Sequence, residues 1–154
     1  MPNKPKIYIE TTLFNHYFDK NRATHADTVT LFKQIAAGKY EAYTSQYVVE
    51  ELEKALEPKR SQMLALIPKL GIQLVDSNDE AARLAAIYIA ERIIPRTYFT
   101  DAIQIAIATV HDLPMIASAN FKHIVKSKTK LATGKINALN GHHPVAIVSP
   151  KEIV

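Results

Sequence analysis

The chain has 154 residues, of which 47% are hydrophobic and 22% charged, and its formal net charge is +4. This length predicts one domain over residues 1–154, large enough to bury about 70% of the surface of the unfolded chain. There are no cysteines, which excludes disulfides and thiolate chemistry. No apolar run approaches the roughly 20 residues of a membrane-spanning helix, so we expect a cytoplasmic protein.

Five short apolar runs predict β-strands, at residues 7–9, 42–44, 72–75, 115–117 and 145–148. Long segments with helical periodicity separate them, and no connection is short enough for a hairpin. Strands that alternate with helices predict an α/β fold with a parallel sheet. Ligands bind such sheets beyond the carboxyl ends of the strands, so polar residues at those ends are the first candidates for function.

The residues that are expected to begin and end the helices agree with this fold class. A helix over residues 24–37 is expected to end at Gly38. A capping box formed by Ser77 and Glu80 is expected to begin the next helix, and Pro95 to stop it at residue 94. The segment 98–111 is apolar nearly all round, which predicts a buried helix.

Three polar residues stand where strands end or buried helices begin. Glu10 directly follows the first predicted strand, and a solvated loop acid is the alternative for it. Asp101 lies in the first turn of the buried helix, where the helix dipole favours an acid but little solvent is expected. Asn120 follows the fourth strand, and it could equally be a helix N-cap.

The helix after the second strand carries two adjacent glutamates with different predicted surroundings. Its buried stripe is predicted to comprise Val48, Leu52 and Leu56. Glu51 lies about 60° from Val48, at the edge of this stripe, whereas Glu50 lies about 160° away and faces water. We therefore expect Glu51, and not Glu50, to belong to a site.

In a parallel sheet these three acids and one amide converge on one edge. Two carboxylates about 4 Å apart repel each other by roughly 4 kcal/mol at an effective dielectric constant of 20. That repulsion calls for protonation or a bound cation, and carboxylate and amide oxygens suit a hard cation such as Mg²⁺ or Mn²⁺. Such an ion in such a site typically serves phosphoryl chemistry.

Four segments of the chain resemble the four motifs of PIN-domain proteins, most closely the toxins of VapBC toxin–antitoxin pairs. They are residues 7–12, Thr44-Ser45 with Glu51-Leu52 behind them, residues 100–108, and residues 116–125. The order and spacing of the four make the resemblance fairly specific, and it covers almost the whole chain.

The resemblance implies a single PIN-like domain with a five-stranded parallel sheet flanked by helices, and an endoribonuclease dependent on Mg²⁺ or Mn²⁺. The catalytic residues it implies are Glu10, Glu51, Asp101 and Asn120, the three acids being the metal ligands, with supporting hydroxyls on Thr12 and Ser118. An antitoxin partner and a homodimer are also expected. The first motif usually carries Asp where this chain has Glu10, and Asn120 reduces the negative charge by one.

One stretch, residues 121–143, holds five lysines and no acid. A solvated basic face is one reading, and a contact surface for phosphates is the other. The candidates for binding the RNA backbone are Lys122, Lys126, Lys128 and Lys130. The adjacent pair His142-His143 is not expected to bind a metal, and Tyr8 and Phe14 are expected in the core.

Two other functions remain open at this point. A catalytically inactive PIN-fold module that binds RNA or protein is favoured by the unusual Glu10. A phosphorylatable receiver-like domain is the other alternative, because Asp76 follows the third strand.

Overall fold

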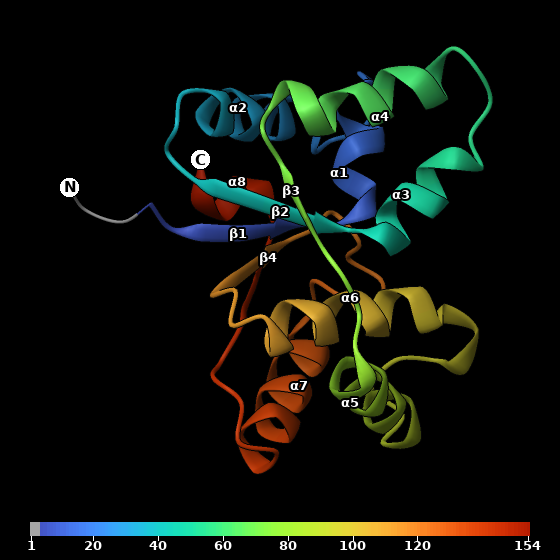
Figure 1. The fold of residues 1–154 in the computed structure, drawn as a ribbon, viewed down its shortest axis with the longest axis vertical. Coiled ribbons are helices and arrows are strands. Elements are labelled where there is room, and N and C mark those ends of the chain that lie inside the picture. Colours follow the sequence, from blue (N-terminus) through green and yellow to red (C-terminus); the bar gives the residue numbers. More distant parts are fainter. Residues whose placement is uncertain (1–3) are drawn as a thin grey trace.

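A central sheet with helices on both faces forms the molecule (Figure 1). The computed structural model describes residues 4–154, so the first three residues of the predicted domain lie outside the described residues. The strands are β1 (Lys6–Ile9), β2 (Glu41–Ser45), β3 (Gln73–Val75), β4 (Met115–Ala117) and β5 (Ala146–Val148). All five predicted strands are confirmed to within one residue at either end.

The helices form two groups on the two faces of the sheet (Figure 1). One group comprises α1 (Thr11–His16), α2 (His25–Ala36), α3 (Gln46–Glu53), α4 (Lys59–Lys69) and α8 (Pro150–Ile153). The other comprises α5 (Asp79–Ala90), the 3-10 turn η1 (Arg96–Tyr98), α6 (Phe99–Val110) and α7 (Ser127–Leu139). No helix within residues 4–154 is long and apolar enough to cross a membrane.

The sheet is parallel throughout and its strand order is β3-β2-β1-β4-β5. The chain runs outward from β1 to β3 and then returns to the other side of β1 at β4. The strand order therefore reverses between β1 and β4, which is where α/β sheets of this kind bind ligands. A receiver-like domain has the order 2-1-3-4-5, so that alternative, built on Asp76, is wrong.

The core is centred on β1 and on the helix that covers it. Ile7, Tyr8 and Ile9 are all fully buried, because β1 is paired on both edges and covered on both faces. In α6, every residue from 102 to 109 is buried, which confirms the buried helix that its nearly all-apolar sequence predicts. Tyr8 and Phe14 lie in the core as expected.

Three local predictions were wrong. Helix α5 is capped by Asn78, whose side chain accepts a hydrogen bond from the Ala81 N–H at 2.8 Å, and not by Ser77. It ends at Ala90, because Arg92 takes a left-handed conformation with φ of 58° before Pro95 is reached. Helix α3 ends at Glu53, so Leu56 lies beyond it and is 85% exposed instead of buried.

The cap of α5 gives a direct test of this correction. Asn78→Ala should lower the free energy of unfolding by about 1 kcal/mol, because it removes the acceptor for a free N–H of the first turn. Ser77→Ala should change it little, since the exposed Ser77 hydroxyl makes only a 3.5 Å contact with a neighbouring carbonyl. Urea unfolding of the two variants would measure both effects, and a larger loss for Ser77→Ala would restore the capping box.

Candidate functional site

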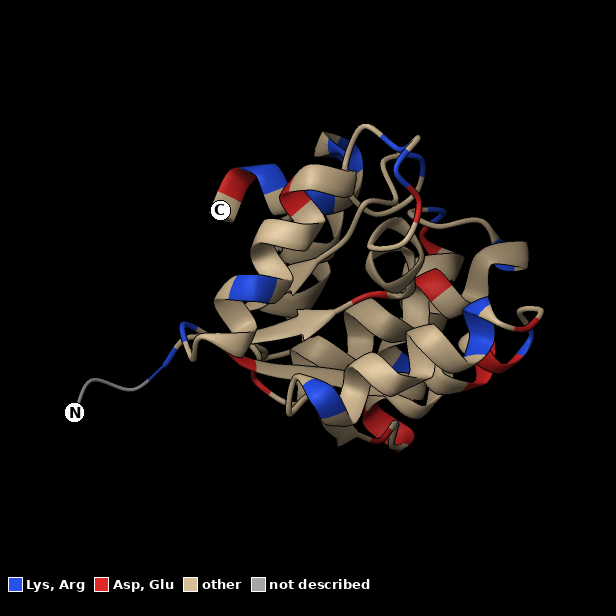
Figure 2. Ribbon diagram, turned by 90° about the horizontal axis from the view of Figure 1, so that it is seen from above, with Lys and Arg blue, Asp and Glu red and all other residues tan. Residues whose placement is uncertain are grey.

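The predicted site residues gather at the carboxyl ends of β1, β2 and β4. Glu10 follows β1, Ser118 follows β4, and Glu51 lies on α3, which begins directly after β2. Asp101 lies in the first turn of α6. Viewed from above, an acidic position follows a strand in the middle of the molecule, whereas most other charged residues lie on the outer helices and loops (Figure 2).

Glu10 is 2% exposed and is held by two hydroxyl groups. Its Oε1 accepts a hydrogen bond from Thr12 Oγ1 at 2.5 Å and one from Ser118 Oγ at 2.6 Å. Its backbone N–H donates to the carbonyl of Ala117 at 3.1 Å, which ties the end of β1 to the end of β4. The two hydroxyls expected to support the site thus both contact this carboxyl group.

Backbone groups fix the direction of these hydroxyls. Thr12 Oγ1 accepts from the Ala119 N–H and Ser118 Oγ accepts from the Asn120 N–H, both at 2.9 Å. Each hydroxyl therefore accepts from the backbone and donates its proton to Glu10. Because Oε1 already accepts two bonds, Oε2 is the oxygen of Glu10 that remains for another ligand.

All three acids have raised pKa values, and burial is the main cause in each. Burial raises the pKa of Glu10 to about 7, with a smaller contribution from the negative charge of Asp101. Burial also raises the pKa of Glu51, again with a contribution from Asp101. Burial raises the pKa of Asp101, and a hydrogen bond from Asn120 opposes this. Asp101 is thus the acid whose charge both glutamates experience.

Asp101 Oδ2 is a buried oxygen with no hydrogen-bond partner within residues 4–154. A buried carboxylate oxygen without a partner is costly, and a proton, a water molecule or a cation would remove that cost. The all-oxygen donor set suits a hard cation such as Mg²⁺ or Mn²⁺. Among the described residues, however, no three acidic or histidine side chains are close enough together to ligate one ion.

The donor set therefore fits an ion held by Asp101 and one glutamate, with water in the remaining positions. Magnesium is commonly bound in this way, through one or two carboxylates, while it keeps several of its waters. Asn120 is a weaker candidate for a metal ligand, because its Oδ1 already accepts a hydrogen bond from the His123 N–H at 3.0 Å. The helix N-cap that was the alternative for Asn120 is wrong, because no helix begins there: α7 starts at Ser127, and the Asn120 side chain closes a turn over residues 121–124.

The expected contrast between the adjacent glutamates is confirmed: Glu51 is half-buried and Glu50 is exposed. Glu51 Oε1 accepts a hydrogen bond from Thr11 Oγ1 at 3.3 Å. Thr11 in turn accepts from Gln104 Nε2 at 3.1 Å, and Gln104 Oε1 accepts from Tyr8 OH at 3.2 Å. A buried chain of hydrogen bonds thus orients the Glu51 carboxylate.

Sequence reasoning missed Gln104 and Thr11, although a signal for Gln104 exists. Gln104 is the one polar residue among the apolar residues 102–108, and it is fully buried. A buried amide must find partners, and so must the hydroxyl of a buried tyrosine such as Tyr8. The sequence does not indicate that the Gln104 amide and the Tyr8 hydroxyl bind each other. Nor does it indicate that the hydrogen bonds continue through Thr11 to Glu51.

The predicted RNA-backbone lysines all follow β4 in the chain, in the segment after Asn120 and at the start of α7. Lys122 and Lys128 are exposed, and Lys126 precedes α7 and is partly exposed. Lys130 forms a 3.6 Å salt bridge with Glu152, so its charge is partly compensated. His142 Nε2 lies 2.8 Å from a Glu80 carboxylate oxygen, and this contact is remote in the sequence from the candidate metal ligands.

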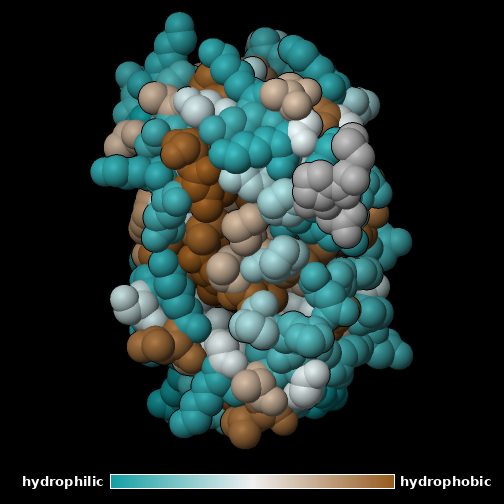
Figure 3. Space-filling model, turned by 90° about the vertical axis from the view of Figure 1, so that its left-hand side faces the viewer, coloured by the Kyte–Doolittle hydropathy of each residue, from teal (hydrophilic) through white to brown (hydrophobic). Residues whose placement is uncertain are grey.

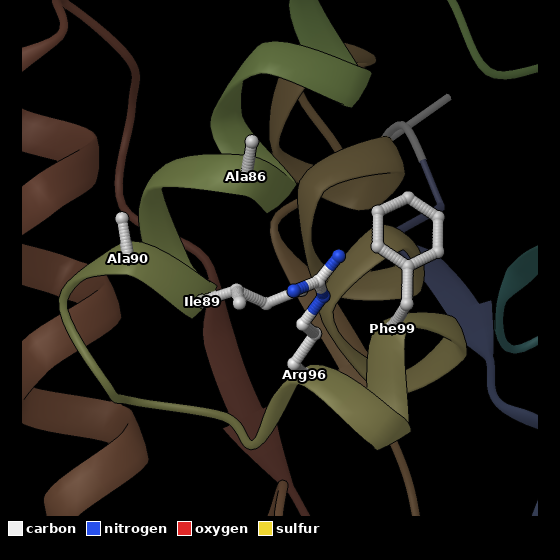
Figure 4. A pocket seen from close by; sticks show the side chains of 5 residues that line it. All are labelled: Ala86, Ile89, Ala90, Arg96 and Phe99. Carbon is white, nitrogen blue, oxygen red and sulfur yellow. The ribbon is translucent and has the colours of Figure 1, made fainter.

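A separate hollow of about 480 Å³ lies between α5 and the start of α6 (Figure 4). It is lined by Ala86, Ile89, Ala90, Arg96 and Phe99. The face at the amino ends of the strands shows hydrophilic side chains around a band of hydrophobic surface (Figure 3). Since none of the hollow's lining residues carries a carboxylate, the acids described above remain the candidate for metal chemistry.

The five-stranded parallel sheet with helices on both faces is the PIN-like α/β fold that the four motifs predict. No family model and no curated protein matches the sequence. Three solved structures are similar in fold. A chain of VapBC2 from Rickettsia felis, bound to a promoter DNA fragment, has a TM-score of 0.58 and 12% identity, over 94% of this chain and 98% of that chain.

The other two are also VapBC complexes. A chain of DNA-bound VapBC from Salmonella typhimurium has a TM-score of 0.55 and 13% identity, over 95% and 98% of the two chains. A chain of VapBC-5 from Mycobacterium tuberculosis, a member of a toxin–antitoxin family, has a TM-score of 0.52 and 18% identity, over 94% and 98%. At these identities the likeness establishes the fold, which agrees with the resemblance seen in the four motifs.

The raised pKa of Glu10 predicts a pH-dependent effect of Glu10→Gln on stability without metal. The folded pKa of about 7 exceeds the ordinary 4.5, so this group stabilises the fold fully below about pH 4.5 and loses that contribution as pH rises through about 7. Gln does not titrate. Relative to wild type, the variant should therefore gain up to about 3 kcal/mol of stability between pH 5 and pH 8.

Urea unfolding in EDTA at the two pH values measures this gain, with Glu50→Gln as the control because Glu50 is exposed. A difference between Glu10→Gln and wild type that stays constant with pH would show that Glu10 is ionised in the fold without penalty.

Proposed function

We propose that this protein is an endoribonuclease dependent on Mg²⁺ or Mn²⁺ and the toxin of a toxin–antitoxin pair. The observation that carries the proposal is the unpaired, buried Asp101 Oδ2. It belongs to the acid that raises the pKa of both Glu10 and Glu51. These acids gather where the strand order reverses, the place at which such sheets bind ligands.

In this proposal Asp101 and one of the two glutamates, Glu10 or Glu51, ligate the cation, with water in its remaining positions. A divalent cation bound there supplies an acidified water and positive charge beside a phosphate. Thr12 and Ser118 keep the Glu10 carboxyl in place through Oε1 and leave Oε2 for the ion. Gln104 and Thr11 orient Glu51 in the same way.

The RNA substrate is bound through its backbone, with Lys122, Lys126 and Lys128 as candidates on the β4 side of the acids. Ammonium groups hold phosphates without reading bases, so cleavage specificity must come from other contacts. The likeness of the fold to chains of VapBC complexes supports an antitoxin partner. We also propose that the protein is a homodimer in the cytoplasm. Sedimentation of the purified chain tests the oligomeric state.

A catalytically inactive PIN-fold module that binds RNA or protein is the second candidate. Two observations favour it: no three acidic or histidine side chains within residues 4–154 are close enough for one ion, and Glu10 is almost fully buried. Such a module would bind RNA equally well with metal or EDTA and would never cleave it. Metal-dependent cleavage therefore separates the two candidates.

Divalent metal should stabilise the fold, because a cation removes the cost of burying several carboxylates together. An ion present at 100 times its dissociation constant adds about 2.7 kcal/mol to stability. Thermal melts in millimolar Mg²⁺ or Mn²⁺ and in EDTA measure the shift. Asp101→Asn should lose the shift and Glu50→Gln should keep it. Equal melting temperatures of the wild type in both conditions would argue against the site.

Substitution of each of the two adjacent glutamates distinguishes a catalytic role from a general effect of negative charge. Glu51→Gln should reduce RNA cleavage by more than about 100-fold, beyond the 10–100-fold effect typical of groups behind a metal ligand. Glu50→Gln makes the same change of charge on the exposed face of α3 and should keep the wild-type rate. Cleavage of a mixed RNA pool with Mg²⁺, Mn²⁺ or EDTA measures both. If Glu50→Gln were the inactive variant, the assignment of α3 would be reversed.

A further inference from the structure

A second groove lies beside Glu51, between α1, α3 and the start of α4. It has a volume of about 340 Å³, within the range of about 300–1,000 Å³ that small-ligand sites occupy. Its lining comprises Thr11, Asn15, Glu51, Leu52, Lys54, Ala55, Lys59 and Met63. Glu51 and Thr11 belong to both the groove and the acid site, so a ligand in the groove extends directly from the candidate catalytic carboxylates.

Two lysines give this groove its charge. The Nζ of Lys59 donates a hydrogen bond to the Asn15 side-chain oxygen, which holds the lysine side chain in place. Lys54 lies near Glu51, where its charge opposes part of the rise in the Glu51 pKa that burial causes. Neither lysine forms a salt bridge with any of the described residues. Two lysines that form no salt bridge within residues 4–154 therefore line a hollow that opens beside the acids.

The rest of the lining matches the chemistry of a nucleotide. Leu52, Ala55 and Met63 provide apolar surface, which suits the face of a sugar or a base. Ammonium groups bind phosphate as point charges. We propose that this groove binds one nucleotide of the RNA strand beside the cleaved bond, with Lys54 and Lys59 contacting its phosphate. This inference rests on RNA being the substrate of the acid site.

The groove lies on the opposite side of the acids from the basic residues that the sequence singled out. Glu51 and the two groove lysines follow β2, whereas Lys122 and Lys126 follow β4. In the sheet, β1 with Glu10 separates β2 from β4. An RNA strand in contact with both sets of lysines crosses the acids at the carboxyl edge of the sheet. This path places a phosphate next to Asp101 and Glu10.

RNA binding measured in EDTA tests the groove without cleavage. The double variant Lys54→Gln, Lys59→Gln removes both charges and keeps polar side chains, one atom shorter than lysine, with an N–H donor for Asn15. It should bind a fluorescein-labelled short single-stranded RNA more weakly at low salt. The slope of log Kd against log salt concentration should fall by up to about 1.4, at about 0.7 for each lost phosphate contact on a single strand.

The matched control is Lys33→Gln, Lys151→Gln, which removes the same charge from exposed positions on α2 and α8. It should keep wild-type affinity and slope, and melting curves should show all variants folded. If the Lys54→Gln, Lys59→Gln variant had the wild-type slope of log Kd against log salt concentration, the inference would be overturned. The groove would then be left to a protein partner. A wild type that binds no RNA at low salt would overturn it as well.

Protection from chemical acetylation gives a second readout on the unmodified protein. Bound RNA should slow acetylation of Lys54 and Lys59, measured by mass spectrometry, while Lys33 and Lys151 react at their free rate. Equal protection of all four would overturn the inference. A wild type that shows this protection but never cleaves RNA with metal would refute the nuclease proposal and retain the groove.

Discussion

The structure depends on the burial of one carboxyl group at the end of its central strand. Because β1 is paired with both β2 and β4, the chain leaves it through a buried position, and Glu10 occupies that position. A charged group there needs compensation, and the hydroxyls of Thr12 and Ser118 supply part of it. The turn after β4 and the start of α1 are thereby joined through the site itself.

The three acids differ in the hydrogen bonds that hold their carboxyl groups in place. Glu10 and Glu51 each accept hydrogen bonds from hydroxyls that are themselves held in place. Asp101 is positioned by a helix whose next eight residues are buried, and its Oδ2 has no partner within residues 4–154. The protein thus holds two carboxylates through hydroxyl groups and leaves one oxygen of the third without a partner among the described residues.

The likeness to the VapBC chains shows how little sequence identity this fold requires. TM-scores of 0.52–0.58 accompany identities of 12–18% over nearly the whole chain. A parallel sheet needs apolar strands and helices that cover both faces, and many sequences meet that demand. A nuclease function is therefore supported by particular residues and not by the fold.

The sequence by itself determined the strands, the buried helix α6 and the difference between Glu50 and Glu51, since each follows from local apolar periodicity. It also placed Glu10, Asp101 and Asn120 at one edge, because parallel strands end together. Only the tertiary structure decided that Asn78 caps α5, that Gln104 reaches Glu51 through Thr11, and that Lys54 and Lys59 share a groove with Glu51. These depend on contacts between distant segments or on competing local caps, which the periodicity of one segment does not contain.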